Sequence, residues 1–175
     1  MRFLESYSTF DFMKITFNPI GKQNLSEVTA IYNYYVENST ATFHLQAVTE
    51  QEMEATLSLN HPVYKSFIIA CDGETVGFCY LGQFRKKEAY DISTEVTLYI
   101  KPTFTGKQIG VEVLSFMEKT AKNLGLKNLV GVITSENTGS LKLFERCGYF
   151  KCGHLKNIGI KFGRALDVIS YQKEI

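Results

Sequence analysis

The first sixty residues are predicted to form one strand and two helices from the spacing of their hydrophobic positions. Met13–Phe17 alternates apolar and polar residues, as a half-buried strand does. Ser26 is a candidate N-cap for a helix that extends to about Val36. Thr49 with Glu52 has the spacing of a capping box, which predicts the start of a second helix.

The pattern after residue 60 changes from successive strands to an alternation of helices and strands. Three strand-like runs lie at 66–71, 75–84 and 91–100, and the Asp72-Gly73 turn between the first two predicts an antiparallel meander. Hydrophobic residues then recur at helical spacing in 108–124, and Gly125 is the expected C-terminal stop. The remaining elements are predicted as a strand, a helix and two strands at 129–134, 137–147, 149–158 and 166–172.

The junction between the strand at 91–100 and the helix at 108–124 has the features of an anion-binding site. The strand stops before Pro102, and a loop that contains Gly106 leads directly into the helix. Backbone N–H groups from Thr105 to Gly110 have no intrahelical partner, and the helix dipole adds partial positive charge where they converge. We therefore expect a pyrophosphate group at this loop. The chain contains neither G-x-x-x-x-G-K-[ST] nor G-x-G-x-x-G after a strand, which excludes a P-loop and a dinucleotide fingerprint.

The composition is that of one soluble domain. The 175 residues are 45% hydrophobic and 21% charged, and a net charge of +1 provides no global field that attracts nucleic acid. No apolar stretch approaches the roughly 20 residues that span a bilayer, and the N-terminus lacks the pattern of a signal peptide. We expect a cytoplasmic protein that binds neither nucleic acid nor membrane. Residues 1–12 precede a second methionine and are expected to be an N-terminal extension outside a single domain at 13–175.

The cysteines and histidines do not form a metal-binding pattern. The four cysteines show no C-x-x-C spacing, and the three histidines are scattered among them. We expect no metal and interpret the cysteines as buried or half-buried thiols. A catalytic cysteine needs a helix N-terminus or a basic neighbour, whereas Cys147 lies near the end of a predicted helix.

The loop and the order of elements together resemble one known superfamily. The pattern Thr105-x-x-Gln108-x-Gly110 resembles the [QR]-x-x-G-x-[GA] coenzyme A loop of the GCN5-related N-acetyltransferases, the GNAT superfamily. The predicted order β-α-α-β-β-β-α-β-α-β-β is also that of the GNAT fold, and the resemblance extends over about 14–175. It implies an α/β (α+β) fold in which about four helices flank a mixed central sheet of about six or seven strands.

Within the superfamily the chain is most similar to the phosphinothricin and methionine-sulfoximine acetyltransferase branch. The matches are spread over the whole domain, which makes them more specific than the loop alone. They are Asn33–Thr40 with Phe43, Ala89-Tyr90-Asp91 leading into Glu95–Tyr99, Asn137-x-x-Ser140, Gly148-Tyr149, Lys161-Phe162-Gly163 and Asp167-Val168.

The resemblance implies that Glu95 is the general base in acetyl transfer from acetyl-CoA to an amine. An amine with a pKa of about 9 to 10 is mostly protonated at neutral pH and attacks a thioester only after losing that proton. A carboxylate accepts the proton directly or through a water, and burial raises the pKa of the carboxyl toward neutrality. The alternative is that Glu95 is a solvated strand residue or part of a structural ion pair.

The resemblance also implies which residues bind coenzyme A. The backbone of Leu98, Tyr99 and Ile100 is expected to bind the pantetheine amides, although Tyr99 is equally open to a role as a core aromatic. Asn137 and Ser140 are expected to contact the cofactor, and the alternative role of Asn137 is the N-cap of the following helix. The pyrophosphate is expected at Thr105, Gly106, Lys107, Gln108, Ile109 and Gly110.

Phe43, Phe84 and Tyr90 are the candidates for contacts with the acceptor, and core packing is the alternative for each of them. His44 stands where the branch has an arginine, and Phe162 stands where its closing motif has a histidine. These changes keep an aromatic-walled pocket but alter its charge.

Two departures from the family pattern affect the expected chemistry. Gln108 stands where the loop has glycine, so a side chain occupies a place of close backbone approach. Glutamine is able to adopt helical backbone angles there, and its side chain is expected to crowd the phosphates. Phe144 stands where many GNAT enzymes have a tyrosine that protonates the leaving thiolate. Because a thiol has a pKa of about 8.5, the thiolate is a tolerable leaving group and we expect slower catalysis rather than none.

The leading hypothesis is an acetyl-CoA-dependent N-acetyltransferase that acts on the primary amine of a small amino acid or analogue. A second hypothesis is acetylation of a protein N-terminus or lysine. The polar loop at 38–44 disfavours it, because this loop indicates a closed small-molecule pocket. A third is a non-catalytic coenzyme-A-binding regulatory domain, which Gln108 and Phe144 suggest and Glu95 disfavours. The resemblance implies a homodimer, with the terminal strands as the candidate contact.

Overall fold

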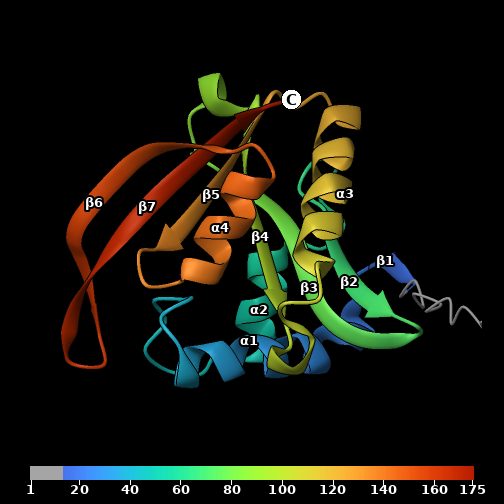
Figure 1. The fold of residues 1–175 in the computed structure, drawn as a ribbon. Helices are drawn as coiled ribbons and strands as arrows, with labels where there is room; N and C mark the ends of the chain where they lie inside the picture. The colour runs from blue at the N-terminus through green and yellow to red at the C-terminus, as the bar shows by residue number, and fades with distance from the viewer. Residues whose placement is uncertain (1–13) are drawn as a thin grey trace, which may run out of the picture.

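The computed structural model describes residues 14–175, in which a seven-stranded mixed sheet has helices on both faces (Figure 1). The expected fold class is confirmed, whereas the proposed extension at 1–12 and the first residue of the predicted first strand, Met13, lie outside the described residues. The strands are β1 Ile15–Pro19, β2 Ser66–Cys71, β3 Glu74–Gln83, β4 Ser93–Ile100, β5 Asn128–Thr134, β6 Phe150–Lys161 and β7 Arg164–Glu174. The helices are α1 Leu25–Asn38, α2 Glu50–Leu57, α3 Ile109–Asn123 and α4 Thr138–Arg146.

The sheet has the strand order β1-β2-β3-β4-β5-β7-β6, and β4–β5 is its parallel pair. The predicted meander of β2, β3 and β4 is present, with antiparallel pairing throughout. The pairing of β4 with β5 is short, because it joins Ser93–Glu95 to Asn128–Val130 and does not continue to the strand ends. The two strands diverge beyond this point (Figure 1). The sheet is therefore split in its middle.

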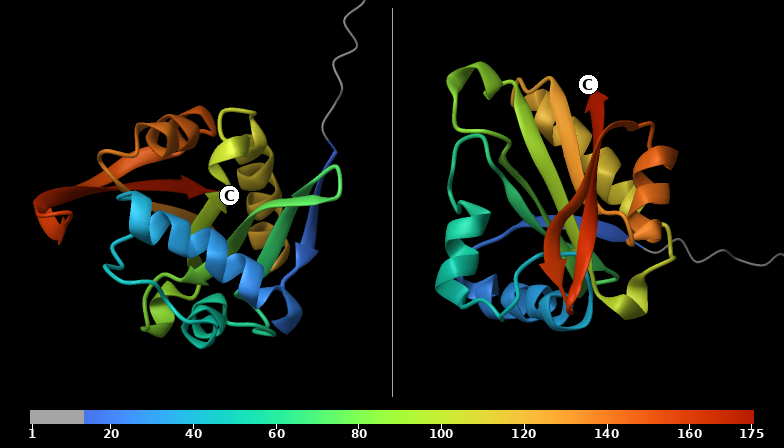
Figure 2. Two further views of the ribbon diagram at one scale, coloured as in Figure 1. Left: turned by 90° about the horizontal axis from the view of Figure 1, so that it is seen from below. Right: turned by 90° about the vertical axis from the view of Figure 1, so that its left-hand side faces the viewer.

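The helices α3 and α4 cover one face of the sheet, and α1 and α2 cover the other (Figure 2). On one face α3 buries Val113, Leu114 and Met117 in a core that includes Leu129 of β5. On the other face α1 and α2 form a second core with Phe78 of β3. The amphipathic stripe predicted for α3 is confirmed, and Gly125 follows the helix with a φ of 82°, as a C-terminal stop requires.

The two predicted helix starts have different outcomes. At α2 the capping box is present, because Thr49 Oγ1 accepts from the Glu52 amide at 3.2 Å and a Glu52 carboxylate oxygen accepts from the Thr49 amide at 2.7 Å. Ser26 is not the N-cap of α1, because a 3₁₀ turn at Lys22–Asn24 starts the helical path earlier. Ser26 therefore lies inside the first turn.

The last two strands form a hairpin that is longer than predicted and extends beyond the rest of the sheet (Figure 1). Its turn is Phe162-Gly163, and both residues have positive φ, at 51° and 74°, as in a type I′ turn. Most of β6 is exposed. The expectation that all cysteines are buried or half-buried is wrong for Cys152, which lies exposed on this strand.

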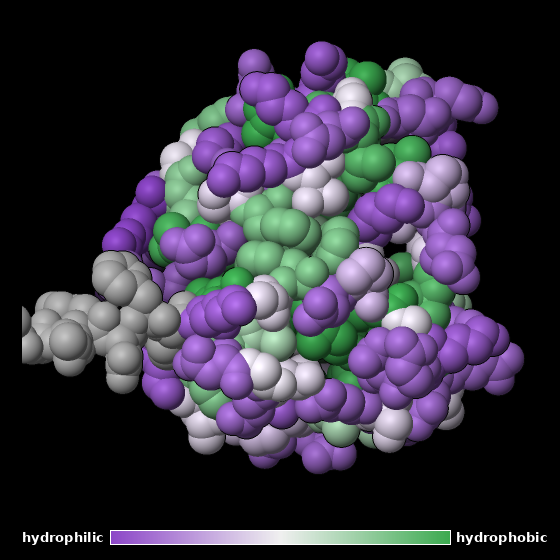
Figure 3. Space-filling view, turned by 90° about the vertical axis from the view of Figure 1, so that its right-hand side faces the viewer, coloured by the Kyte–Doolittle hydropathy of each residue, from purple (hydrophilic) through white to green (hydrophobic). Residues whose placement is uncertain are grey.

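The surface is polar over most of the side shown in Figure 3, where hydrophobic residues form a limited central area. Exposed large hydrophobic side chains elsewhere include several on the β6–β7 hairpin. In residues 14–175 no helix is both long enough and apolar enough to cross a membrane. The same residues contain no cluster of three or more side chains suited to a metal ion.

Candidate active site

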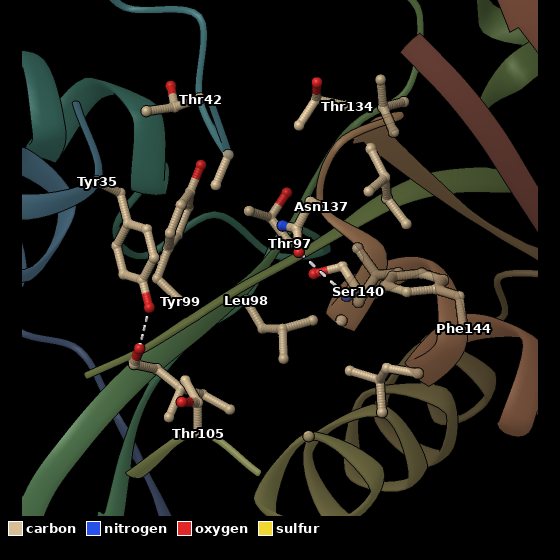
Figure 4. A pocket seen from close by; sticks show the side chains of 18 of the residues that line it. Tyr35, Thr42, Thr97, Leu98, Tyr99, Thr105, Thr134, Asn137, Ser140 and Phe144 are labelled. Carbon is tan, nitrogen blue, oxygen red and sulfur yellow. Dashed lines mark hydrogen bonds between the residues drawn. The ribbon is translucent and has the colours of Figure 1, made fainter. Parts of the chain in front are cut away.

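A cavity of about 850 Å³ lies where β4 and β5 diverge. Its lining comes from α1, the loop at 40–43, β3, β4, the segment at 104–108, the start of α3, β5, α4 and β7. Side chains alternate along β4, so Glu95, Thr97 and Tyr99 face the α1 layer, whereas Val96 and Leu98 face the α3 layer. Both sets line the cavity, which therefore passes from one face of the sheet to the other (Figure 4). Its volume is in the range of small-molecule and cofactor sites.

The loop before α3 borders the cavity on the α3 face. Five of its six predicted phosphate-binding residues line the cavity: Thr105, Gly106, Gln108, Ile109 and Gly110. Lys107 is outside the lining and holds its ammonium 4.7 Å from the centre of the Phe104 ring. Within the described chain, the amides of residues 106–108 have no backbone partner, as a site for a pyrophosphate requires.

Gln108 does not have the helical backbone angles that glutamine is able to adopt. Its φ is 63° and its ψ is 1°, so it has the left-handed conformation that glycine adopts at low cost. The side chain extends toward α4, where its Oε1 accepts a hydrogen bond from Arg146 at 3.4 Å. The glycine of the family pattern is thus explained by backbone conformation, and this chain carries strain where it has glutamine.

The start of α4 contributes polar side chains to the same end of the cavity. Asn137 is the N-cap of the helix, because its Oδ1 accepts from the Ser140 amide at 3.1 Å (Figure 4). Both residues also line the cavity. Asn137 therefore has the N-cap role that was its alternative. In this position its side-chain amide group also lies near the cavity.

Two cations on α4, Lys142 and Arg146, line the cavity and were not among the predicted site residues. They are four residues apart on α4, so they lie on one face of the helix. This spacing is the sequence signal that identifies them. Together with Lys107 they place positive charge around the loop expected to hold a pyrophosphate.

Glycines allow the close packing on which this side of the cavity depends. A Cβ on Gly110 would lie 2.7 Å from Leu143 Cδ2, so α3 and α4 approach closely at this point. A Cβ on Gly131 would lie 2.2 Å from the ring of Phe144. Phe144 is 3% exposed and lines the cavity, where its ring offers no proton.

Glu95 lies on the α1 side of the cavity, half-buried on β4. Its partner across the strand pair is Gly82, which leaves the space beside the carboxylate free of a side chain. Burial raises the pKa of the Glu95 carboxyl above that of an ordinary glutamate. Within residues 14–175 the carboxylate has no salt-bridge partner, so a structural ion pair is not observed.

Aromatic side chains form the wall of the cavity opposite α3. Tyr99 has the core-aromatic role given as its alternative, since it is 9% exposed and its ring lies 5.1 Å from that of Tyr32 and 5.3 Å from that of Phe78. Tyr35 donates a hydrogen bond to the carbonyl of Ile100 (Figure 4). Along 96–100 the edge of β4 toward β5 has no paired strand, so its backbone groups, apart from this carbonyl, are available to a ligand.

The three candidate acceptor residues do not all meet at the cavity. Phe43 lines it, whereas Phe84 and Tyr90 are outside the lining. The last two pack against each other edge to face, with ring centroids 5.8 Å apart. Residues that sequence reasoning missed on the α1 side of the cavity include Thr42 and Thr97, of which Thr97 shares a strand face with Glu95.

Comparisons with known proteins agree on one family. The model of the acetyltransferase (GNAT) domain matches residues 19–169. The chain is similar to a phosphinothricin N-acetyltransferase of Alcaligenes faecalis, with 29% identity over 91% of this chain and 82% of that protein. It is also similar to an L-methionine sulfoximine/L-methionine sulfone acetyltransferase of Pseudomonas aeruginosa, with 30% identity over 91% of this chain and 94% of that protein. A solved phosphinothricin acetyltransferase from Sinorhizobium meliloti in complex with AcCoA has a TM-score of 0.86 and 27% identity, over 93% of this chain and 89% of that one.

Proposed function

Because this chain belongs to the GNAT family and is an acetyl-CoA-dependent N-acetyltransferase, we propose that its acceptor is the primary amine of a small amino acid or amino-acid analogue. The names of its relatives support this acceptor class, since they include phosphinothricin and methionine sulfoximine acetyltransferases. The observation that supports it most is the cavity, which has the cofactor loop on one face of the sheet and Glu95 on the other. We propose that donor and acceptor meet in the gap between β4 and β5.

In this proposal each face of the sheet has its own role. The amides before α3 and the cations of α4 hold the phosphates of acetyl-CoA, and the free edge of β4 at Leu98–Ile100 binds the pantetheine amides. Acetyl-CoA supplies the activated acetyl group. The residues on the α1 face hold the acceptor and exclude water, with Phe43 as one wall.

Glu95 is the proposed general base. Its carboxylate removes one proton from the acceptor ammonium, directly or through a water, so that the nitrogen lone pair is free to form the C–N bond as the C–S bond breaks. The half-buried position favours this role, because desolvation raises the pKa of the carboxyl and strengthens it as a base. Since Phe144 offers no proton to the departing thiolate, we assign that proton to the ammonium product or a water.

The test is release of coenzyme A thiol from acetyl-CoA against free amino acids, methionine sulfoximine, phosphinothricin and a set of peptides. Turnover on free amino acids or analogues that exceeds turnover on peptides by more than tenfold would support the proposal. Turnover confined to peptides would refute the acceptor class while leaving the acetyltransferase activity in place.

We also propose a homodimer in which β6 contributes to the contact. β6 is one of the two edge strands of the sheet and carries large apolar side chains that are 53–72% exposed, namely Phe150, Leu155, Ile158 and Ile160. Most of β6 is exposed, and a second copy would cover its apolar side chains. Sedimentation equilibrium of the wild type and of Ile160→Lys tests this, and a wild-type monomer at micromolar concentration would refute it.

A cytoplasmic location is the last part of this proposal. The four cysteines are free thiols, which suits a reducing compartment. Fractionation of the source cells with a specific antibody tests it.

A further inference from the structure

Lys161 is a buried cation at the end of β6, close to the turn of the β6–β7 hairpin. Its side chain is 3% exposed, and its Nζ donates to the carbonyl oxygen of Thr42 at 2.8 Å. No carboxylate lies within salt-bridge distance of this ammonium in residues 14–175. A buried charge without a counterion is costly. Its one hydrogen bond therefore connects the hairpin firmly to the loop at 40–44.

Thr42 is part of the acceptor side of the cavity. It lines the cavity, and its hydroxyl lies 2.6 Å from the hydroxyl of Tyr32, which also lines it. The same Tyr32 hydroxyl hydrogen-bonds His44 Nδ1 at 2.8 Å. The Tyr32 ring packs edge to face on Tyr99 of β4. The Lys161 contact thus leads through Thr42 to the aromatic wall beside the gap in the sheet.

Two further contacts join the hairpin to the same loop. A Cβ on Gly159 would lie 2.4 Å from the Phe43 ring, so this ring packs directly on the bare backbone of β6. Glu136, just before α4, accepts a hydrogen bond from Thr40 Oγ1 at 3.3 Å and pairs with Arg164 of β7. The loop is therefore held by its backbone at Thr42, by the ring of Phe43 and by a polar contact at Thr40.

We propose that Lys161 is a positioning residue for acceptor binding, which holds Thr42 and Phe43 in place so that the β6–β7 hairpin sets the affinity for the acceptor. This inference rests on the proposed function, because it assumes that the amine is bound on the α1 face. Lys161 itself is outside the cavity lining and acts through the Thr42 carbonyl. In residues 14–175 its one side-chain hydrogen bond goes to Thr42 and none goes to the loop at 105–110, so we expect acetyl-CoA affinity to be independent of it.

The first test compares Lys161→Met with Lys161→Arg and with Lys156→Met, an exposed lysine on the same strand. We expect Lys161→Met to raise the acceptor KM at least tenfold while the Kd for acetyl-CoA stays within twofold. Lys161→Arg is expected to recover part of the acceptor affinity, and Lys156→Met to match the wild type. An unchanged acceptor KM, or an equal loss of affinity for both substrates, would overturn the proposal.

Amide hydrogen exchange makes the test independent of the acceptor's identity. Lys161→Met is expected to speed exchange in residues 40–44 at least tenfold and to leave residues 105–110 unchanged. Equal exchange at 40–44 in the variant and the wild type would overturn the positioning role. A wild type that turns over no small amine would instead refute the proposed function, so the two failures are distinguishable.

A second variant guards against misfolding of the first. Gly159→Ala displaces the Phe43 ring, which is 38% exposed and has room to move, so the hairpin is expected to remain folded. Gly153→Ala on the same strand is the matched control, because its Cβ would meet no atom closer than 3.6 Å. We expect a rise in acceptor KM of fivefold or more for Gly159→Ala alone. Equal KM values for the two variants would argue against control of the acceptor site by the hairpin.

Discussion

Replacing Glu95 with glutamine isolates the proposed base from the rest of the site. Glutamine has nearly the same shape and cannot take a proton from the acceptor, so only acceptor that is already unprotonated reacts. For an amine with a pKa of about 9.5, roughly one molecule in a hundred is unprotonated at pH 7.5. We therefore expect the turnover of Glu95→Gln to fall about a hundredfold at that pH, within the range of general-base effects.

The pH dependence of the deficit is the more specific signature. As pH rises toward the pKa of the amine, the unprotonated fraction grows tenfold per unit and the gap between variant and wild type should close. For the wild type, burial raises the pKa of the Glu95 carboxyl, and the active form is the carboxylate. Activity should therefore be lost on acidification at a higher pH than an exposed glutamate would give.

The assay is thiol release between pH 6 and 10, with binding of acetyl-CoA measured by calorimetry on the same samples. Glu88→Gln is the control, since this glutamate is exposed on a turn outside the cavity lining. We expect the Kd for acetyl-CoA to be unchanged and the melting temperature of Glu95→Gln at pH 7.5 to be no lower than that of the wild type, because a partly buried charge is removed. More than half of wild-type turnover at pH 7.5, or a deficit of the same size at every pH, would refute the assignment.

Three further substitutions address the cofactor side. Gln108→Gly should raise the free energy of unfolding in urea by about 1 kcal/mol, because it removes the strain of a non-glycine residue in the left-handed conformation. Equal or lower stability of the variant would contradict this. Asn137→Ala should lower the free energy of unfolding by about 1 kcal/mol, because the contact to the Ser140 amide is lost. It should also weaken acetyl-CoA binding in calorimetry. Unchanged binding would show that Asn137 acts only as the N-cap of α4. Lys142→Ala should weaken acetyl-CoA binding about threefold to tenfold at low salt and less at high salt. Lys122→Ala, on α3 outside the cavity lining, is the control. An equally large loss of affinity in the control would show a nonspecific charge effect.

Local sequence signals predicted the elements well wherever the physical cause is local. The capping box at Thr49 and the stop at Gly125 depend on a few neighbouring residues, and both are present. The helix start near Ser26 was missed because a 3₁₀ turn precedes it, and no strong side-chain cap marks its beginning. The length of β6 was missed because nearly all of its residues are exposed, so no alternation of hydrophobic positions marks its end.

Residues of the candidate site could be predicted only where a local sequence motif or the alternation of side chains along a strand identifies them. Glu95 and five of the six loop residues line the cavity because they belong to one strand–loop–helix unit that is continuous in sequence. The contact of Lys161 with Thr42 joins positions 119 residues apart, and only the assembled sheet brings them together. Phe84 was expected at the acceptor from its place in the chain, but it packs instead in a loop outside the cavity lining.

The split between β4 and β5 has a consequence for how long the enzyme survives in its folded form. A sheet that stops pairing at Glu95 leaves backbone donors and acceptors of β4 without partners, and such groups weaken a fold unless something satisfies them. In the proposed binding mode the ligand fills the place of the missing ladder. At a hundred times its Kd, a ligand that binds only the folded state adds about 2.7 kcal/mol of stability. The metabolic supply of activated acetyl groups would then govern the lifetime of this protein as well as its rate of turnover.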